Sequence, residues 1–134
     1  MIALDTSAIV AIALDEPEAE AFKRAVRDET VLIGWPTLFE TRIVLASKGF
    51  ANASAIVAAL ADAPNVAALP FDRKHYQAAE LAFERFGKGR HPAGLNMGDC
   101  FAYAVAMVGA AQLLFKGGDF GQTDVTRHPA SAVL

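Results

Sequence analysis

The sequence predicts an α/β fold, with helices on both faces of a central parallel sheet of four to five strands. Short apolar runs, many ending at Gly, Asp or Pro, alternate along the chain with longer segments that have helical periodicity. This alternation is typical of parallel strands joined by crossover helices, which form a three-layer α/β/α domain. The chain has 134 residues, a length that suits a single domain over residues 1–134 with one substantial core.

The N-terminal half begins with a short apolar strand, Met1–Leu4, and a helix follows to about Leu14. Thr6 and Ser7 can each cap that helix, so Asp5 is not needed for capping. Pro36 suits the first turn of a later helix. The remaining elements of this half are expected as a helix over 18–28, a strand over 31–33, a helix over 36–48 and a helix over 51–63.

The C-terminal half continues the alternation. We expect a strand over 66–71, a helix from 73 to about 86 capped by Asp72, a strand over 113–115 and a short fifth strand near Val125. Between them, Asn96 caps a helix that begins MGDCFAYAVAMV. This helix is apolar all round except for one carboxylate, Asp99, and a helix of that kind is usually central and buried.

Four carboxylates occupy positions that such a fold brings to one edge. Asp5 and Asp119 follow the first and fourth strands, Asp99 lies in the first turn of the apolar helix, and Glu40 lies near the start of another helix. Ligands bind beyond the carboxyl ends of strands in open parallel sheets. A local role explains each acid singly: a cap for Asp5, the helix dipole for Asp99, a turn for Asp119 and a solvated helix face for Glu40. The apolar neighbours of Glu40 favour an inward orientation instead.

Carboxylates gathered in this way indicate a divalent cation. They raise one another's pKa unless a cation lies among them. Oxygen ligands without a His or Cys cluster favour Mg²⁺ or Mn²⁺ over Zn²⁺, and such an ion supports phosphodiester hydrolysis. We expect Asp5, Asp99 and Asp119 to bind the metal and Glu40 to join them in catalysis. Supporting roles, through hydroxyls, a phosphate contact or a further carboxylate, are expected for Thr6, Ser7, Lys116, Thr123 and Asp124.

Composition limits the remaining possibilities. The net charge of −3 is not that of a protein that binds nucleic acid through a basic surface, although bound metal can neutralise the acids. Hydrophobic residues make up 54% of the chain, which predicts surplus apolar surface buried against a partner. A single cysteine favours a reducing, cytoplasmic setting. The longest uncharged run, Cys100 to Phe115, is shorter than the ~20 residues of a membrane-spanning helix.

Four segments in order resemble the motifs of PIN-domain ribonucleases, and specifically of VapC toxins from type II (VapBC) toxin–antitoxin systems. They are MIALDTSAIVAI, PTLFETRIVLA, GLNMGDCFAYAVA and LLFKGGDFGQTDV, of which the third is the most specific. The resemblance covers the whole chain and implies the PIN fold. It assigns the three core acids to Asp5, Glu40 and Asp99, and Asp119 is the best match for the fourth.

The resemblance also implies an activity and partners. It implies an endoribonuclease that depends on Mg²⁺ or Mn²⁺ and cuts tRNA or other structured RNA. A VapB-type antitoxin would cover the acidic site, and a homodimer, a toxin–antitoxin hetero-oligomer and operator binding through the antitoxin are expected. One position departs from the pattern: Gly118 stands where close relatives commonly have an aspartate. A second hypothesis is therefore a catalytically impaired module that acts mainly as an antitoxin-binding, operator co-regulatory partner.

Overall fold

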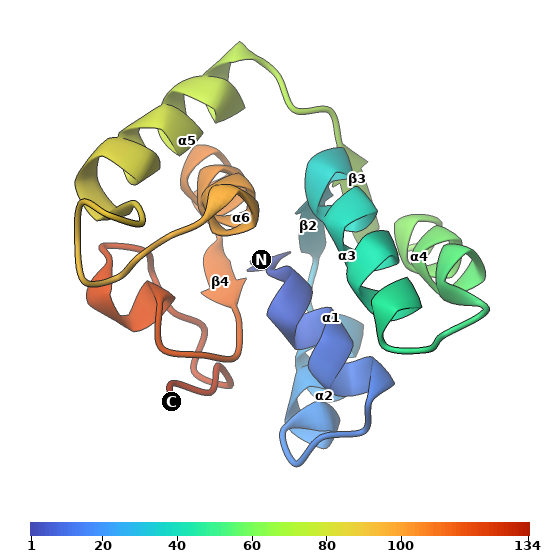
Figure 1. Ribbon diagram of the computed structural model, residues 1–134. Coiled ribbons are helices and arrows are strands. Elements are labelled where there is room, and N and C mark those ends of the chain that lie inside the picture. Colours follow the sequence, from blue (N-terminus) through green and yellow to red (C-terminus); the bar gives the residue numbers. More distant parts are fainter.

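The computed structural model describes residues 1–134 and has a four-stranded parallel sheet at its centre (Figure 1). The strands are β1 (Ile2–Leu4), β2 (Val31–Gly34), β3 (Val66–Leu69) and β4 (Gln112–Leu114), in the spatial order β3-β2-β1-β4. Every neighbouring pair is parallel. The first strand of the chain therefore lies in the middle, paired with the last strand on one side.

Six helices cover the two faces of the sheet. They are α1 (Thr6–Ala13), α2 (Ala19–Asp28), α3 (Trp35–Ser47), α4 (Ala53–Ala61), α5 (Arg73–Phe86) and α6 (Met97–Val108), and a short 3₁₀ helix spans Phe120–Gln122. Figure 1 shows α1 to α4 on one side of β1 and the pair α5 and α6 on the other. The predicted three-layer α/β/α fold is confirmed, and the helix and strand ends differ from the predicted ones by a residue or two.

The core has two parts that share the sheet. On β1, Ile2 and Leu4 contact the side formed by α1 to α4, whereas Ala3 between them contacts the side formed by α5 and α6. Both faces of the strand are buried, which explains why it reads as a continuous apolar run rather than an alternating one. Helix α6 is buried over most of its length, as its apolar sequence predicts.

The expected fifth strand near Val125 does not form as a strand. The C-terminal tail instead follows β4 and pairs with the chain there through two isolated parallel bridges, Leu113 with Arg127 and Lys116 with Ala132. A turn lies between these bridges, closed by the hydrogen bond from the Ser131 N–H to the His128 carbonyl at 2.9 Å, and it interrupts the pairing.

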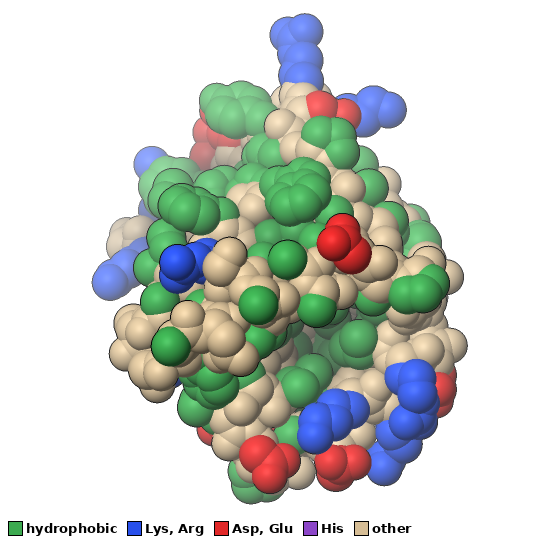
Figure 2. All heavy atoms as spheres, turned by 90° about the vertical axis from the view of Figure 1, so that its right-hand side faces the viewer, with side chains coloured by type: hydrophobic (Ala, Val, Ile, Leu, Met, Phe, Trp, Pro, Cys, Tyr) green, Lys and Arg blue, Asp and Glu red, His purple; other side chains and the backbone are tan.

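Several large apolar side chains remain at the surface, in line with the surplus that the composition predicts. On α3 they are Trp35, Phe39 and Ile43, which are 53%, 67% and 52% exposed. Figure 2, a view from the side of α3 and α4, shows hydrophobic side chains spread over much of this face. None of the helices combines the length and the apolar character needed to cross a bilayer.

Candidate active site

Asp5 lies directly after β1 and is itself the N-cap of α1. Its Oδ2 accepts hydrogen bonds from the backbone N–H of Ser7 at 3.0 Å and from the Ser7 hydroxyl at 2.5 Å. The expectation that Thr6 or Ser7 caps this helix is therefore wrong, because both residues lie inside it. The Asp5 side chain is buried, and this burial is the main reason that its pKa rises from 3.8 to about 6.

Glu40 is half-buried on α3, and its Oε1 accepts a hydrogen bond of 2.6 Å from the hydroxyl of Thr6. Its inward orientation does not come from a surrounding apolar face, because Phe39 and Ile43 on either side are exposed. The carboxylate lies instead against Gly98 of α6, where a Cβ atom would overlap it. Sequence reasoning did not identify Gly98; the available signal was a glycine inside the first turn of a helix.

Asp99 forms a capping box at the start of α6. Its backbone N–H donates to Asn96 Oδ1 at 2.8 Å, and its Oδ2 accepts from the backbone N–H of Asn96 at 3.0 Å. This reciprocal pair orients the carboxylate and leaves its Oδ1 without a hydrogen bond. Asp99 therefore has a structural role and also an oxygen that is free for other chemistry.

The four predicted acids act on one another electrostatically. The pKa of Asp99 is raised from 3.8 to about 7, mainly by burial and further by the negative charges of Asp5, Asp119 and Glu40. Glu40 also raises the pKa of Asp5. Asp119 follows β4 at the start of the 3₁₀ helix and is exposed. The fold thus brings the four acids into one neighbourhood, which we call the acid cluster: Asp5, Glu40, Asp99 and Asp119.

The acid cluster suits a hard divalent cation by its chemistry. All its donors are carboxylate oxygens, and a cation among them would relieve the repulsion that raises two of the pKa values. In the structure, no group of three His, Cys, Asp or Glu side chains lies close enough to hold one ion. The cluster is therefore an open arrangement of suitable ligands rather than a closed coordination shell.

The supporting residues have other partners. Thr6 donates its hydroxyl to Glu40, and Ser7 donates to Asp5 while its Oγ accepts from the backbone N–H of Lys116 at 3.0 Å. The Lys116 ammonium forms ion pairs with Glu16 and Glu18, both at 3.0 Å, and the hydrogen bonds to these carboxylates raise its pKa. Lys116 is therefore paired with two acids that do not belong to the acid cluster.

Thr123 and Asp124 form hydrogen bonds that hold the C-terminal segment in place. The Thr123 hydroxyl donates to the carbonyl of Phe120 at 2.8 Å. Asp124 accepts from the Tyr103 hydroxyl at 2.6 Å and from the Arg85 guanidinium at 3.0 Å. Both Asp124 oxygens are thus occupied by groups outside the acid cluster.

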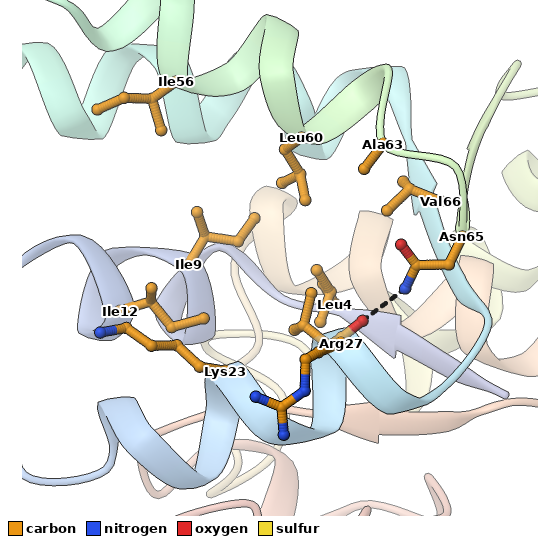
Figure 3. Close-up of a pocket in the computed structure, with 11 residues that line it drawn as sticks. Leu4, Ile9, Ile12, Lys23, Arg27, Ile56, Leu60, Ala63, Asn65 and Val66 are labelled. Atoms are coloured by element: carbon orange, nitrogen blue, oxygen red, sulfur yellow. Dashed lines mark hydrogen bonds between the residues drawn. The ribbon is translucent and has the colours of Figure 1, made fainter.

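A separate apolar groove lies between α1, α2 and α4 (Figure 3). Leu4, Ile9 and Leu60 are among the apolar residues that line it, and Lys23 and Arg27 stand on the α2 side. Asn65 closes one end, where its side-chain amide donates to the Val26 carbonyl at 2.6 Å. None of the four acids lines this groove, so it is distinct from the acid cluster.

Comparison with known proteins agrees with this arrangement. The family model of the PIN domain matches residues 2–125. Ribonuclease VapC of Mycolicibacterium smegmatis is 45% identical over 123 residues, which cover 91% of this chain and 95% of that protein. Ribonuclease VapC30 of Mycobacterium tuberculosis H37Rv is 38% identical over 123 residues, covering 91% and 94%. The chain belongs to the PIN-domain family.

Solved structures share the fold of this PIN domain. VapC20 of Mycobacterium tuberculosis, described as a Sarcin-Ricin loop cleaving toxin, superposes with a TM-score of 0.77 at 20% identity, covering 96% of this chain and 98% of that one. VapBC2 from Rickettsia felis, bound to a DNA fragment from its promoter, gives 0.64 at 16% identity, covering 100% and 98%. At these identities the similarity shows the architecture of the PIN domain, with β1 central and β4 beside it.

Proposed function

We propose that this PIN domain is the toxin of a type II toxin–antitoxin system, an endoribonuclease that needs Mg²⁺ or Mn²⁺ to hydrolyse phosphodiester bonds in tRNA or another structured RNA. The observation that carries the proposal is the acid cluster, in which burial and like charge raise the pKa of Asp5 and Asp99. Relatives named VapC ribonuclease at 38–45% identity support the same reaction.

We assign the residues in and around the acid cluster different roles in the reaction. Asp5, Asp99 and Asp119 would hold the cation, which supplies an activated water and stabilises the leaving oxygen when bound. Ser7 orients the Asp5 carboxylate, and Asn96 orients that of Asp99. Glu40, whose Oε1 is fixed by the Thr6 hydroxyl, would accept a proton from the water that attacks the phosphodiester.

Gly118 gives the impaired-module hypothesis little geometric support. A Cβ at this position would lie 3.2 Å from the backbone oxygen of Leu134, the last residue of the tail. An aspartate there would start in close contact with this backbone oxygen. The four acids of the cluster are all present in this chain without that carboxylate.

We expect the antitoxin partner to cover the acid cluster, and we place a further segment of the same partner in the groove of Figure 3. Its floor is apolar, and Lys23 and Arg27 stand at its edge in exposed ion pairs with Glu20 and Asp28. Exposed pairs of this kind contribute little stability and exchange partners readily. An amphipathic antitoxin segment with acidic side chains along one margin would match this surface. The exposed face of α3, with Trp35, is our candidate for the homodimer contact.

The test is a cleavage assay with protein freed of any antitoxin. Total RNA is incubated with the protein in Mg²⁺, in Mn²⁺ and in EDTA, with Asp99→Asn alongside. Asn keeps an oxygen that can accept from the Asn96 N–H, so the capping box and the fold survive. We expect discrete fragments that need the metal and disappear in the variant, and the fragment ends would identify the target. Cleavage by folded Asp99→Asn would refute the site, and no cleavage by the folded parent in either metal would refute the activity.

A further inference from the structure

Behind Glu40 lies a second hydroxyl that the proposed mechanism does not use. Thr41, the next residue on α3, is fully buried, and its Oγ1 lies 3.1 Å from Oγ1 of Thr6. The Thr41 hydroxyl also lies 2.8 Å from the carbonyl oxygen of Thr37. Thr41 makes no contact with a carboxylate of the acid cluster except through Thr6.

The number of hydroxyl protons determines which group donates in the series of hydrogen bonds from Thr41 to Glu40. A hydroxyl has one proton to donate, and that of Thr6 goes to Glu40 at 2.6 Å. The contact between Thr6 and Thr41 is therefore a hydrogen bond only when Thr41 is the donor. The Thr41 hydroxyl donates to the Thr37 carbonyl at 2.8 Å, and Thr6 Oγ1, at 3.1 Å, is the second acceptor within reach of the same proton. In such a three-centre arrangement Thr41 shares its proton with Thr6, and Thr6 in turn donates to Glu40.

On the side opposite Thr6, the Glu40 carboxylate lies against the backbone of α6 at Gly98. Both carboxylate oxygens of Glu40 lie where a Cβ on Gly98 would overlap them. Helix α3 packs against both α1 and α6 at this point. The Glu40 carboxylate is thus enclosed between the Thr6 hydroxyl on α1 and the bare backbone of α6, one residue before Asp99.

We propose that Thr41 is a positioning residue of the acid cluster, which acts through Thr6 to hold the Glu40 carboxylate against Gly98. The effect on RNA cleavage rests on the proposed function. The holding of Glu40 itself does not, and it is measurable in protein without metal or RNA.

The substitution that tests this is Thr41→Val, which removes the hydroxyl and preserves the branched shape. We expect kcat for RNA cleavage to fall about tenfold, equivalent to about 1.4 kcal/mol, while KM changes less than about twofold because no RNA contact is altered. Thr41→Ser restores the hydroxyl, and we expect it to recover most of the lost kcat.

The chain offers a matched control one turn earlier on the same helix. Thr37 is equally buried, but its side-chain hydroxyl has no hydrogen-bond partner. Thr37→Val therefore removes a buried hydroxyl from α3 without removing any of the hydroxyls that lead from Thr41 through Thr6 to Glu40. We expect this variant to keep the parental kcat. Equal losses of kcat in Thr37→Val and Thr41→Val would mean a general packing effect and would overturn the proposal.

A second measurement needs no activity. The shift in urea midpoint caused by Thr41→Val is compared in the parental protein and in Glu40→Ala, with metal removed. If Thr41 acts on Glu40, the shift is at least halved when Glu40 is absent, whereas the shift for Thr37→Val is the same in both backgrounds. Identical Thr41→Val shifts in the two backgrounds would overturn the positioning role. Absence of cleavage by the parental protein would refute the proposed function alone, and this cycle would still decide the role of Thr41.

Discussion

Replacement of Asp5 by Asn is expected to make the protein more stable while it abolishes cleavage. The buried carboxylate has its pKa raised from 3.8 to about 6, first by burial. At 1.36 kcal/mol per pKa unit, the ionised form costs the folded state about 3 kcal/mol near neutral pH. Asn has nearly the same shape, can accept from the Ser7 N–H and is an equally good N-cap. The gain is therefore at most about 3 kcal/mol, or about 10 °C in melting temperature for a domain of this size.

The pH dependence distinguishes this cause from a general improvement in packing. A raised carboxyl pKa means that the folded state binds the proton more tightly than the unfolded state. The parental protein therefore loses stability as pH rises from about 4 to about 6. Asp5→Asn should match the parent near pH 4 and exceed it near pH 8. The assay is urea denaturation in EDTA at both pH values, with exposed Asp119→Asn as the control that changes stability by less than about 0.5 kcal/mol. An Asp5→Asn protein no more stable than the parent near pH 8 would refute the electrostatic account.

Three further predictions concern the same region. Mn²⁺ should raise the melting temperature more near pH 8 than near pH 5, because ionised Asp5 and Asp99 bind it and protonated ones do not; equal shifts in a thermal scan would contradict this. Gly98→Ala should lower kcat at least about tenfold by displacing Glu40, and retention of full activity would show that the contact is dispensable. Gly118→Asp should change the cleavage rate by less than about twofold, because its side chain starts beside Leu134; a large gain would revive the impaired-module hypothesis.

The sequence predicted the layers of the fold well because each strand and helix has local signals. Apolar runs mark β1 to β4, and caps such as Asn96 and Asp72 mark helix starts that the structure confirms. The choice of cap at α1 could not be predicted in this way. Asp5, Thr6 and Ser7 are all good caps. In the structure Asp5 is the cap, and the Thr6 hydroxyl donates instead to Glu40, which is distant in sequence.

The orientation of Glu40 shows a second limit of prediction from the sequence. Neighbouring apolar residues on a helical wheel suggested a buried face, but Ile43 is half exposed. Periodicity cannot distinguish an apolar face that meets the core from one left at the surface. The contact that does enclose Glu40 comes from Gly98, and contacts between helices depend on tertiary packing rather than on local pattern. The ion pairs of Lys116 with Glu16 and Glu18 are long-range in the same sense.

The pairing of β1 with β4 has a consequence for biosynthesis. Asp5 is translated well before β4 and Asp119, because synthesis runs from the N-terminus to the C-terminus. A nascent chain therefore cannot bring the four acids together until β4 and Asp119 have been made. For a protein that we propose cleaves RNA, we expect a nascent chain that lacks β4 and Asp119 to leave its own ribosome and message uncut.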